Sequence, residues 1–143
     1  MSELPAGAPA GSHVIPDSYS PPFHKTLRVC MAIGPNGEGV AWLDVDPERH
    51  YGARWAHGGV VPALVDIASG IAIARTLADA AKAIDGTIDL KVNFLRKVID
   101  GDITAVARLL RAGKRVAFTE VEVTNKGTRV AMALATFMLN RDR

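Results

Sequence analysis

The sequence predicts an α+β domain in which an antiparallel sheet wraps around one long central helix. Residues 58–74 carry one charged side chain and are otherwise apolar or small, over about the length of a buried helix. The segments on either side alternate between apolar and polar residues, which is the period of a β-strand. The later segments are joined by short links, and short links force neighbouring strands to pair antiparallel.

The composition narrows the class of protein. The 143 residues, 48% apolar and 22% charged, fit one ordinary globular domain. A net charge of +2 and 6% aromatic residues do not favour nucleic-acid binding. The lone Cys30 excludes an internal disulfide, and no metal-ligand spacing or nucleotide motif stands out, so we expect neither metal nor cofactor. Neither a membrane-length apolar run nor a targeting segment is visible, which predicts a cytoplasmic protein without membrane contact.

Residues 1–22 predict a disordered N-terminal arm. They hold five prolines among Ala, Gly and Ser. Regular structure is therefore expected to begin near Phe23, and residues 23–143 are expected to form the domain. Removal of the first 20 residues is expected to leave folding and activity nearly unchanged.

The next segments predict a hairpin and a loop. Apolar side chains alternate over residues 27–32, as in a strand. Residues 34–39 are rich in Gly, Pro and Asn and predict a turn, so residues 40–45 form the returning strand. Breakers within residues 46–56 predict a loop.

The central helix begins after a glycine pair. Pro62 fits its first turn, where a missing N–H costs nothing. The helix is predicted to continue past Arg75, to pair that residue with Asp79 on an exposed face, and to end at Gly86. Because residues 58–74 are apolar all round, one sheet cannot bury them. We therefore expect a second copy to cover the rest, in a homodimer or a dimer of dimers.

Four strands are predicted after the helix. Residues 87–95 alternate strictly, and residues 103–110 follow after a turn. In residues 116–124 the apolar parity switches, which predicts a bulge near residues 119–120. Residues 130–139 are apolar on both faces, as in a central strand.

Asp66 does not fit its apolar surroundings. It is the only charge between Arg54 and Arg75. A buried ionised carboxylate is costly unless it is paired or hydrated, so this residue needs a partner or a task. Its helical neighbours three and four residues away are compact, which leaves space for a substrate or a partner helix. The alternative is a structural carboxylate that caps another segment or pairs with Arg54.

His57, Gly58 and Gly59 stand at the start of the same helix. Glycines let another molecule approach the free backbone N–H groups, and the positive end of the helix dipole favours a partly negative oxygen. An oxyanion site is built in this way. One helix thus offers an electrophilic end and, two turns on, a carboxylate base.

Three strings carry a resemblance to a known family: HGGVVPALVDIASG, then TIDLKVNFL, then AMALATF. Together they resemble the PaaI-like branch of the hotdog-fold acyl-CoA thioesterases. The resemblance covers roughly residues 27–139, and its most specific part is HGG with an acid nine residues after the histidine. It implies a hotdog fold, a dimer with active sites at the interface, and hydrolysis of acyl-CoA to the free acid and CoA.

The resemblance also implies roles for single residues. Asp66 matches the acid that activates water or attacks the carbonyl, and Gly58 matches the residue whose N–H polarises the thioester oxygen. His57 helps to shape the turn, and Thr87 matches a Ser or Thr that orients the acid or the water. In related dimers the acid of one chain faces the glycine turn of the other. The plainer alternatives are that His57 only holds backbone and that Thr87 only opens a strand.

Two positions before the histidine depart from the family pattern. Many relatives have Asn or Gln about six residues before it and Gly three before it, whereas Tyr51 and Arg54 stand here. Tyr51, Arg54 or the neighbouring His50 is expected to replace the missing amide at the substrate. Gly59 is expected to let the substrate approach the turn.

Basic and aromatic residues supply further candidates. Arg96 and Lys97 end a strand and Arg115 lies in a basic hairpin, so contact with the phosphates of CoA is one interpretation and a solvated rim is the other. The candidates for an acyl pocket, each of which also suits a core, are Trp42, Trp55, Phe94 and Phe137.

Two other functions stay open beside hydrolysis. A non-catalytic acyl-CoA-binding hotdog protein, acting as a sensor or scaffold, is consistent with the missing amide. A hydratase for enoyl thioesters ranks last, because no Asp is followed five residues later by His. The acyl group and the choice between base and nucleophile for Asp66 are left open.

Overall fold

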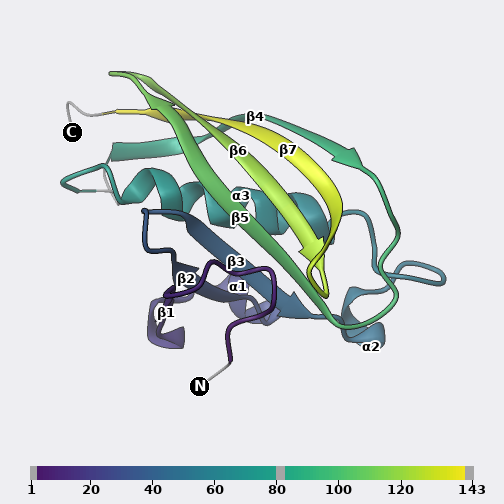
Figure 1. Cartoon of the computed structure of the whole chain (residues 1–143). Coiled ribbons are helices and arrows are strands. Elements are labelled where there is room, and N and C mark those ends of the chain that lie inside the picture. Colours follow the sequence, from purple (N-terminus) through teal and green to yellow (C-terminus); the bar gives the residue numbers. More distant parts are fainter. Residues whose placement is uncertain (1–2, 80–82, 141–143) are drawn as a thin grey trace.

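A seven-stranded sheet curves around the long helix α3 (Figure 1). The computed structural model describes residues 3–79 and 83–140. Within these residues the strand order is β1-β2-β3-β5-β6-β7-β4 and every pairing is antiparallel, which confirms the predicted α+β class. The elements are β1 (His13–Ile15), η1 (Asp17–Tyr19), α1 (Pro22–Leu27), β2 (Cys30–Ile33), β3 (Gly39–Asp44), α2 (Pro47–His50), α3 (Val60–Ala74), β4 (Ile84–Phe94), β5 (Asp102–Ala112), β6 (Val116–Asn125) and β7 (Thr128–Leu139).

Regular structure begins earlier than Phe23. Strand β1 pairs with β2 at the edge of the sheet. Helix α1 ends at Leu27, the first residue of the predicted strand, and β2 begins only at Cys30. The N-terminal segment also contacts the outer face of the sheet, where Ala8 and Val14 pack against the buried cluster that contains Trp42. The composition of the N-terminal segment alone could not predict this contact, because the residues that it covers lie on β2, β3 and β5.

The first hairpin leads to a short helix instead of a plain loop. Helix α2 lies within the predicted loop of residues 46–56. It begins after Asp46, whose side chain accepts a hydrogen bond from the Glu48 N–H, and Pro47 suits its first position. This turn of helix places His50 inside the protein, where it is 2% exposed.

Helix α3 packs against the concave face of the sheet at very short range. A Cβ on Gly39 of β3 would lie 1.9 Å from the Ala68 carbonyl oxygen, so a glycine is required for this approach. The buried hydroxyls of Ser69 and Thr119 meet at 2.7 Å across the helix–sheet contact. Both polar groups are therefore satisfied inside the core.

The end of α3 corrects one prediction. The helix ends at Ala74, where the N–H of Thr76 and its hydroxyl both donate to the Ile73 carbonyl. Arg75 is the C-cap of the helix and Asp79 lies beyond it, so these two residues do not share the predicted helix face, and Gly86 lies inside β4. Residues 80–82, over which the helix was predicted to continue, lie outside the described residues.

The predicted bulge lies on the neighbouring strand. The register between β5 and β6 shifts between Leu109 and Arg111, opposite residues 118–119. Strand β6 keeps its alternation, with Thr119 buried against α3 and Phe118 exposed. Strand β7 has a neighbour on each side, as predicted for a central strand.

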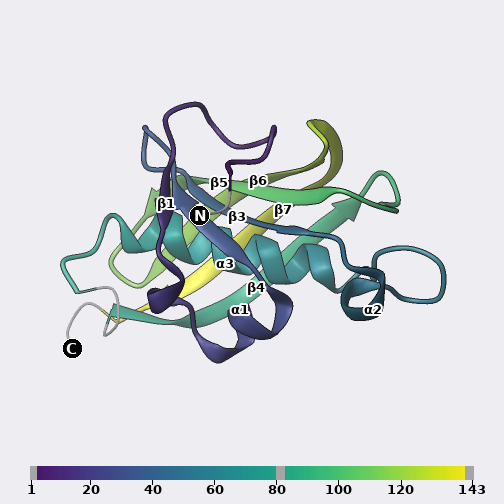
Figure 2. The same cartoon turned by 90° about the horizontal axis from the view of Figure 1, so that it is seen from below.

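One stripe of α3 is left uncovered by the sheet. Seen from below, the helix is visible between β3 and β4 (Figure 2). The residues along this stripe are only half-buried, whereas the opposite side is buried. The half-buried residues of the helix are Pro62, Ala63, Asp66, Gly70, Ile71 and Ala74.

In the described part of the chain, no helix combines the length and apolarity needed to cross a membrane.

We expect deletion of residues 1–16 to destabilise the protein, whereas the composition of this segment predicted almost no effect of its removal on folding. Uncovering Trp42, which is 3% exposed, removes an apolar contact worth about 2 kcal/mol. Trp42 fluorescence, followed in a Trp55→Phe background, is expected to shift to the red and the melting temperature to fall. An unchanged spectrum and melting temperature would show that the segment contributes nothing to the outer face.

Candidate active site

A cavity of about 370 Å³ opens between the glycine turn and the end of β4. His57 and Gly58 line one side, and Arg96 and Lys97 line the other. The structure thus brings together four predicted site residues that lie far apart in the sequence. Apolar side chains complete the wall, and they include two of the predicted acyl-pocket aromatics: Trp55, Val61, Phe94, Val98 and Ile103.

Backbone geometry at the turn leaves one N–H group free. The His57 Nδ1 accepts a hydrogen bond from the Gly59 N–H at 2.9 Å, and the His57 carbonyl accepts from the Val60 N–H at 3.0 Å. Within the described residues, the Gly58 N–H has no hydrogen-bond acceptor. A Cβ on Gly59 would lie 3.0 Å from His57 Nδ1, so the second glycine makes room for the imidazole. The free Gly58 N–H borders the cavity and can polarise an oxygen placed there.

Asp66 and Thr87 meet on the open stripe of α3. The Thr87 hydroxyl, from β4, donates a hydrogen bond to Asp66 Oδ1. A Cβ on Gly70, one turn away, would meet nothing within 4 Å, so the carboxylate borders open space. The alternative partner Arg54 instead places its guanidinium 5.4 Å from the centre of the Trp55 ring. The hydroxyl holds the carboxylate in one orientation and leaves Asp66 Oδ2 to accept a proton.

His24 is a neighbour of Asp66 that sequence reasoning missed. Burial lowers the pKa of its imidazole, and the nearby carboxylate of Asp66 partly opposes that shift. Its Nδ1 is buried and has no hydrogen-bond partner among the described residues. No signal in the sequence pointed to this residue, because α1 falls at the boundary between the predicted arm and the predicted strand.

The acid and the glycine turn of one chain are separated by the helix itself. Helix α3 begins at Val60, just after the glycine turn, and the six helical steps from Val60 to Asp66 rise about 9 Å along the axis. A single thioester carbonyl is too small to touch both groups across this distance.

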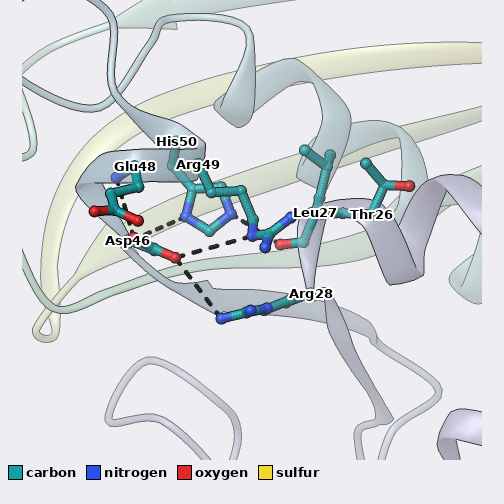
Figure 3. Close-up of polar contacts among 7 residues, drawn as sticks. All are labelled: Thr26, Leu27, Arg28, Asp46, Glu48, Arg49 and His50. Atoms are coloured by element: carbon teal, nitrogen blue, oxygen red, sulfur yellow. Dashed lines mark hydrogen bonds and ion pairs between the residues drawn. The ribbon is translucent and has the colours of Figure 1, made fainter.

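The residues that were expected to replace the family amide are engaged elsewhere. His50 is buried, and its two ring nitrogens contact the Asp46 N–H and the Leu27 carbonyl, each at 2.9 Å (Figure 3). The Tyr51 hydroxyl donates to the Ile99 carbonyl at 2.6 Å. Neither side chain lines the cavity, so no amide substitute is found among these two.

The predicted phosphate-binding residues divide into two groups. Lys97 lies with its Nζ 5.1 Å from the centre of the Trp55 ring, and Arg96 donates to the Arg129 carbonyl at 2.8 Å, both beside the cavity. Arg115 lies near the opposite end of β4, because its carbonyl accepts from the Leu139 N–H and Leu139 pairs with Ile84. A strand of 11 residues separates the two ends by about 30 Å.

Two of the four aromatic candidates lie away from the cavity. Trp42 packs on the outer face of the sheet, and Phe137 lies in the main core. Among the described residues, no group of three or more His, Cys, Asp or Glu side chains is arranged to hold a metal ion.

Comparison with known proteins gives consistent results. A family model described as the thioesterase superfamily matches residues 55–132. The medium/long-chain acyl-CoA thioesterase YigI of Escherichia coli (strain K12) is 35% identical over 137 residues, covering 85% of this chain and 87% of that protein. Acyl-coenzyme A thioesterase 13 of Homo sapiens is 29% identical over 108 residues, covering 74% of this chain and 75% of that protein.

Solved structures show the same fold. A mutant of the phenylacetic acid degradation protein PaaI from Thermus thermophilus has a TM-score of 0.71 and 26% identity, covering 82% of this chain and 98% of that chain. A conserved protein from Pseudomonas aeruginosa has a TM-score of 0.77 and 24% identity, covering 87% of this chain and 98% of that chain.

We expect His24 to make the protein less stable in acid. Because its pKa is lower in the folded chain than the usual value of 6.5, the unfolded chain binds the proton more readily as the pH falls through that value. His24→Gln is expected to flatten the fall in urea midpoint between about pH 8 and pH 5. His13→Gln, at an exposed histidine of β1, is the matched control. Equal slopes in the parent and His24→Gln would contradict the assignment.

Proposed function

The chain belongs to the thioesterase superfamily, and we propose that it hydrolyses acyl-CoA thioesters to a free acid and CoA. The observation that carries the proposal is the pairing of two features on one helix: a free Gly58 N–H beside an apolar cavity, and the Asp66 carboxylate held by Thr87. Thioester hydrolysis needs both an electrophilic group and a group that activates water.

The proposed chemistry assigns one task to each group. The Gly58 N–H donates to the thioester oxygen, where negative charge develops. Asp66 accepts a proton from water as the water oxygen bonds to the carbonyl carbon, and the C–S bond then breaks with release of the CoA thiolate. Thr87 keeps the carboxylate oriented throughout. If Asp66 is instead the nucleophile, its oxygen displaces the CoA thiolate and forms an acyl anhydride, which water then hydrolyses. In single-turnover reactions in ¹⁸O-water, attack of water on the aspartyl carbonyl of this anhydride would place the label in Asp66.

We infer that two chains complete each active site. The distance along α3 prevents one chain from bringing its own carboxylate to its own glycine turn. Strand β4 is at the edge of the sheet, so its outer backbone groups are free to pair with the β4 of a second copy. Ile88 and Phe94 of β4 and the adjacent Leu95 are each more than half exposed in the single chain. Pairing through this edge would cover them and set Asp66 of one chain opposite the glycine turn of the other.

The cavity suits the two ends of an acyl-CoA. Its apolar wall would hold the acyl group or the pantetheine arm, and the cationic rim of Arg54, Arg96 and Lys97 would meet the phosphates. The relative named a medium/long-chain acyl-CoA thioesterase makes those chain lengths the first substrates to test, beside short and aromatic ones. A cytoplasmic location and activity without a cofactor stay predictions.

A binding protein without catalysis is the second candidate. Tyr51 stands where many relatives have an amide, and its hydroxyl is occupied by the Ile99 carbonyl. A protein that binds acyl-CoA but releases no thiol from short, medium, long or aromatic acyl-CoA would have this function.

Asp66→Asn is expected to lower kcat by about 10²–10⁴-fold while the fold and acyl-CoA binding are kept. The substitution is nearly isosteric, and it removes the group that accepts the proton. Thiol release is measured with the best acyl-CoA substrate, and binding is measured by calorimetry. Asp17→Asn, at an exposed carboxylate, serves as the control. Turnover within a few-fold of the parent would make Asp66 structural.

Sedimentation is expected to show at least two chains per particle at micromolar concentration. Ile88→Lys places a charge on the exposed edge strand, so it is expected to weaken association and to lower activity in proportion to the monomer formed. An active monomer would contradict the shared site.

A further inference from the structure

His50 is a buried imidazole that the proposed chemistry does not use. It is 2% exposed, on the last residue of α2. Its Nδ1 accepts a hydrogen bond from the Asp46 N–H, so the Nε2 that faces the Leu27 carbonyl must carry the proton. Figure 3 shows the ring between these two backbone groups. The side chain is thus a neutral bridge from the start of α2 to the end of α1.

The backbone of the same residue reaches the glycine turn. The His50 carbonyl accepts a hydrogen bond from the His57 N–H at 2.7 Å. His57 in turn accepts from the Gly59 N–H through its Nδ1. These two bonds lie on either side of Gly58, and they fix the peptide plane that carries its free N–H.

The loop between His50 and the turn has few other buried anchors. Residues 52–55 are exposed. Tyr51 forms an isolated bridge with Ala56, and the Ala56 N–H donates to the Val98 carbonyl at 2.9 Å. These contacts hold the loop to the strand side of the cavity, whereas His50 holds it to α1.

We propose that His50 is a positioning residue that sets the direction of the Gly58 N–H by joining α1, α2 and the glycine turn through one ring and one carbonyl. The inference rests on the proposed function, because it assumes that this N–H polarises the thioester. It adds a residue that acts through the backbone and touches no substrate.

The chemistry of the bridge explains why an imidazole is needed. The two backbone groups require an acceptor and a donor at opposite ends of a flat ring. Asn can offer an oxygen near the Nδ1 position to the Asp46 N–H, but it is too short to reach the Leu27 carbonyl. Phe fills the volume and satisfies neither group.

The test compares His50→Phe and His50→Asn with Arg49→Ala. Arg49 gives a matched control, because it also links α2 to α1, through a bond from its Nη1 to the Thr26 carbonyl at 2.9 Å. That bond is exposed, and the Arg49 Nε also lies 3.9 Å from Asp46 Oδ2 (Figure 3). Each variant is assayed well below its own melting temperature for kcat, KM and the amide resonances of Gly58 and Gly59.

We expect His50→Phe to lower kcat by about tenfold or more with KM within about twofold, since complete loss of an oxyanion donor costs roughly 10²–10³-fold. The Gly58 amide resonance should move, His50→Asn should recover part of kcat, and Arg49→Ala should change neither. Parent-like kcat and an unmoved Gly58 resonance in His50→Phe would overturn the proposal, as would an equal effect of Arg49→Ala.

Two further outcomes are decided by the same measurements. If His50→Phe does not fold, the kcat and Gly58 resonance of His50→Asn decide between positioning and a purely structural role. If the parent hydrolyses no acyl-CoA, the proposed function fails. The amide resonances then still show whether His50 sets the turn.

Discussion

The close approach of α3 to β3 is the constraint on which the rest of the structure depends. Only a glycine at position 39 permits the contact with the Ala68 carbonyl, so the depth of the helix in the sheet is set at that point. The paired hydroxyls of Ser69 and Thr119 add a directional contact that sets the rotation of the helix about its axis. A helix fixed in depth and rotation presents its glycine turn and its one carboxylate at defined places.

The rotation of the helix decides what its two polar features face. Asp66 lies on the side that the sheet leaves open, where the edge strand supplies the Thr87 hydroxyl. Gly58 lies at the helix start, beside the cavity and the end of the same edge strand. Because a rigid helix separates them, the proposed hydrolysis requires the Gly58 N–H of one protomer and the Asp66 carboxylate of another. In that proposal, the edge strand β4 links catalysis to assembly.

Two histidines, the buried His50 and the half-buried His24, show how the local environment assigns different roles to one residue type. His50 has both ring nitrogens paired with backbone, so its task is to hold the chain. His24 has a buried Nδ1 without a partner in the described chain and a carboxylate nearby, and burial keeps its pKa below the usual value. His24 lies in α1 and His50 is the last residue of α2, so both short helices support the candidate site.

Local patterns in the sequence were sufficient to predict the alternating strands, the apolar helix, and the presence of a glycine turn and Asp66 on that one helix. These features depend on residues only a few positions apart, so they can be recognised from the amino-acid sequence alone. Tertiary structure decided which faces and partners were used. Thr119 points inward because Ser69 offers a buried hydroxyl, and β1 forms because β2 presents an open edge. Arg96 and Lys97 lie near the glycine turn, and His24 lies near Asp66, only because distant segments come together in the fold. No periodic pattern in a single sequence reveals such contacts.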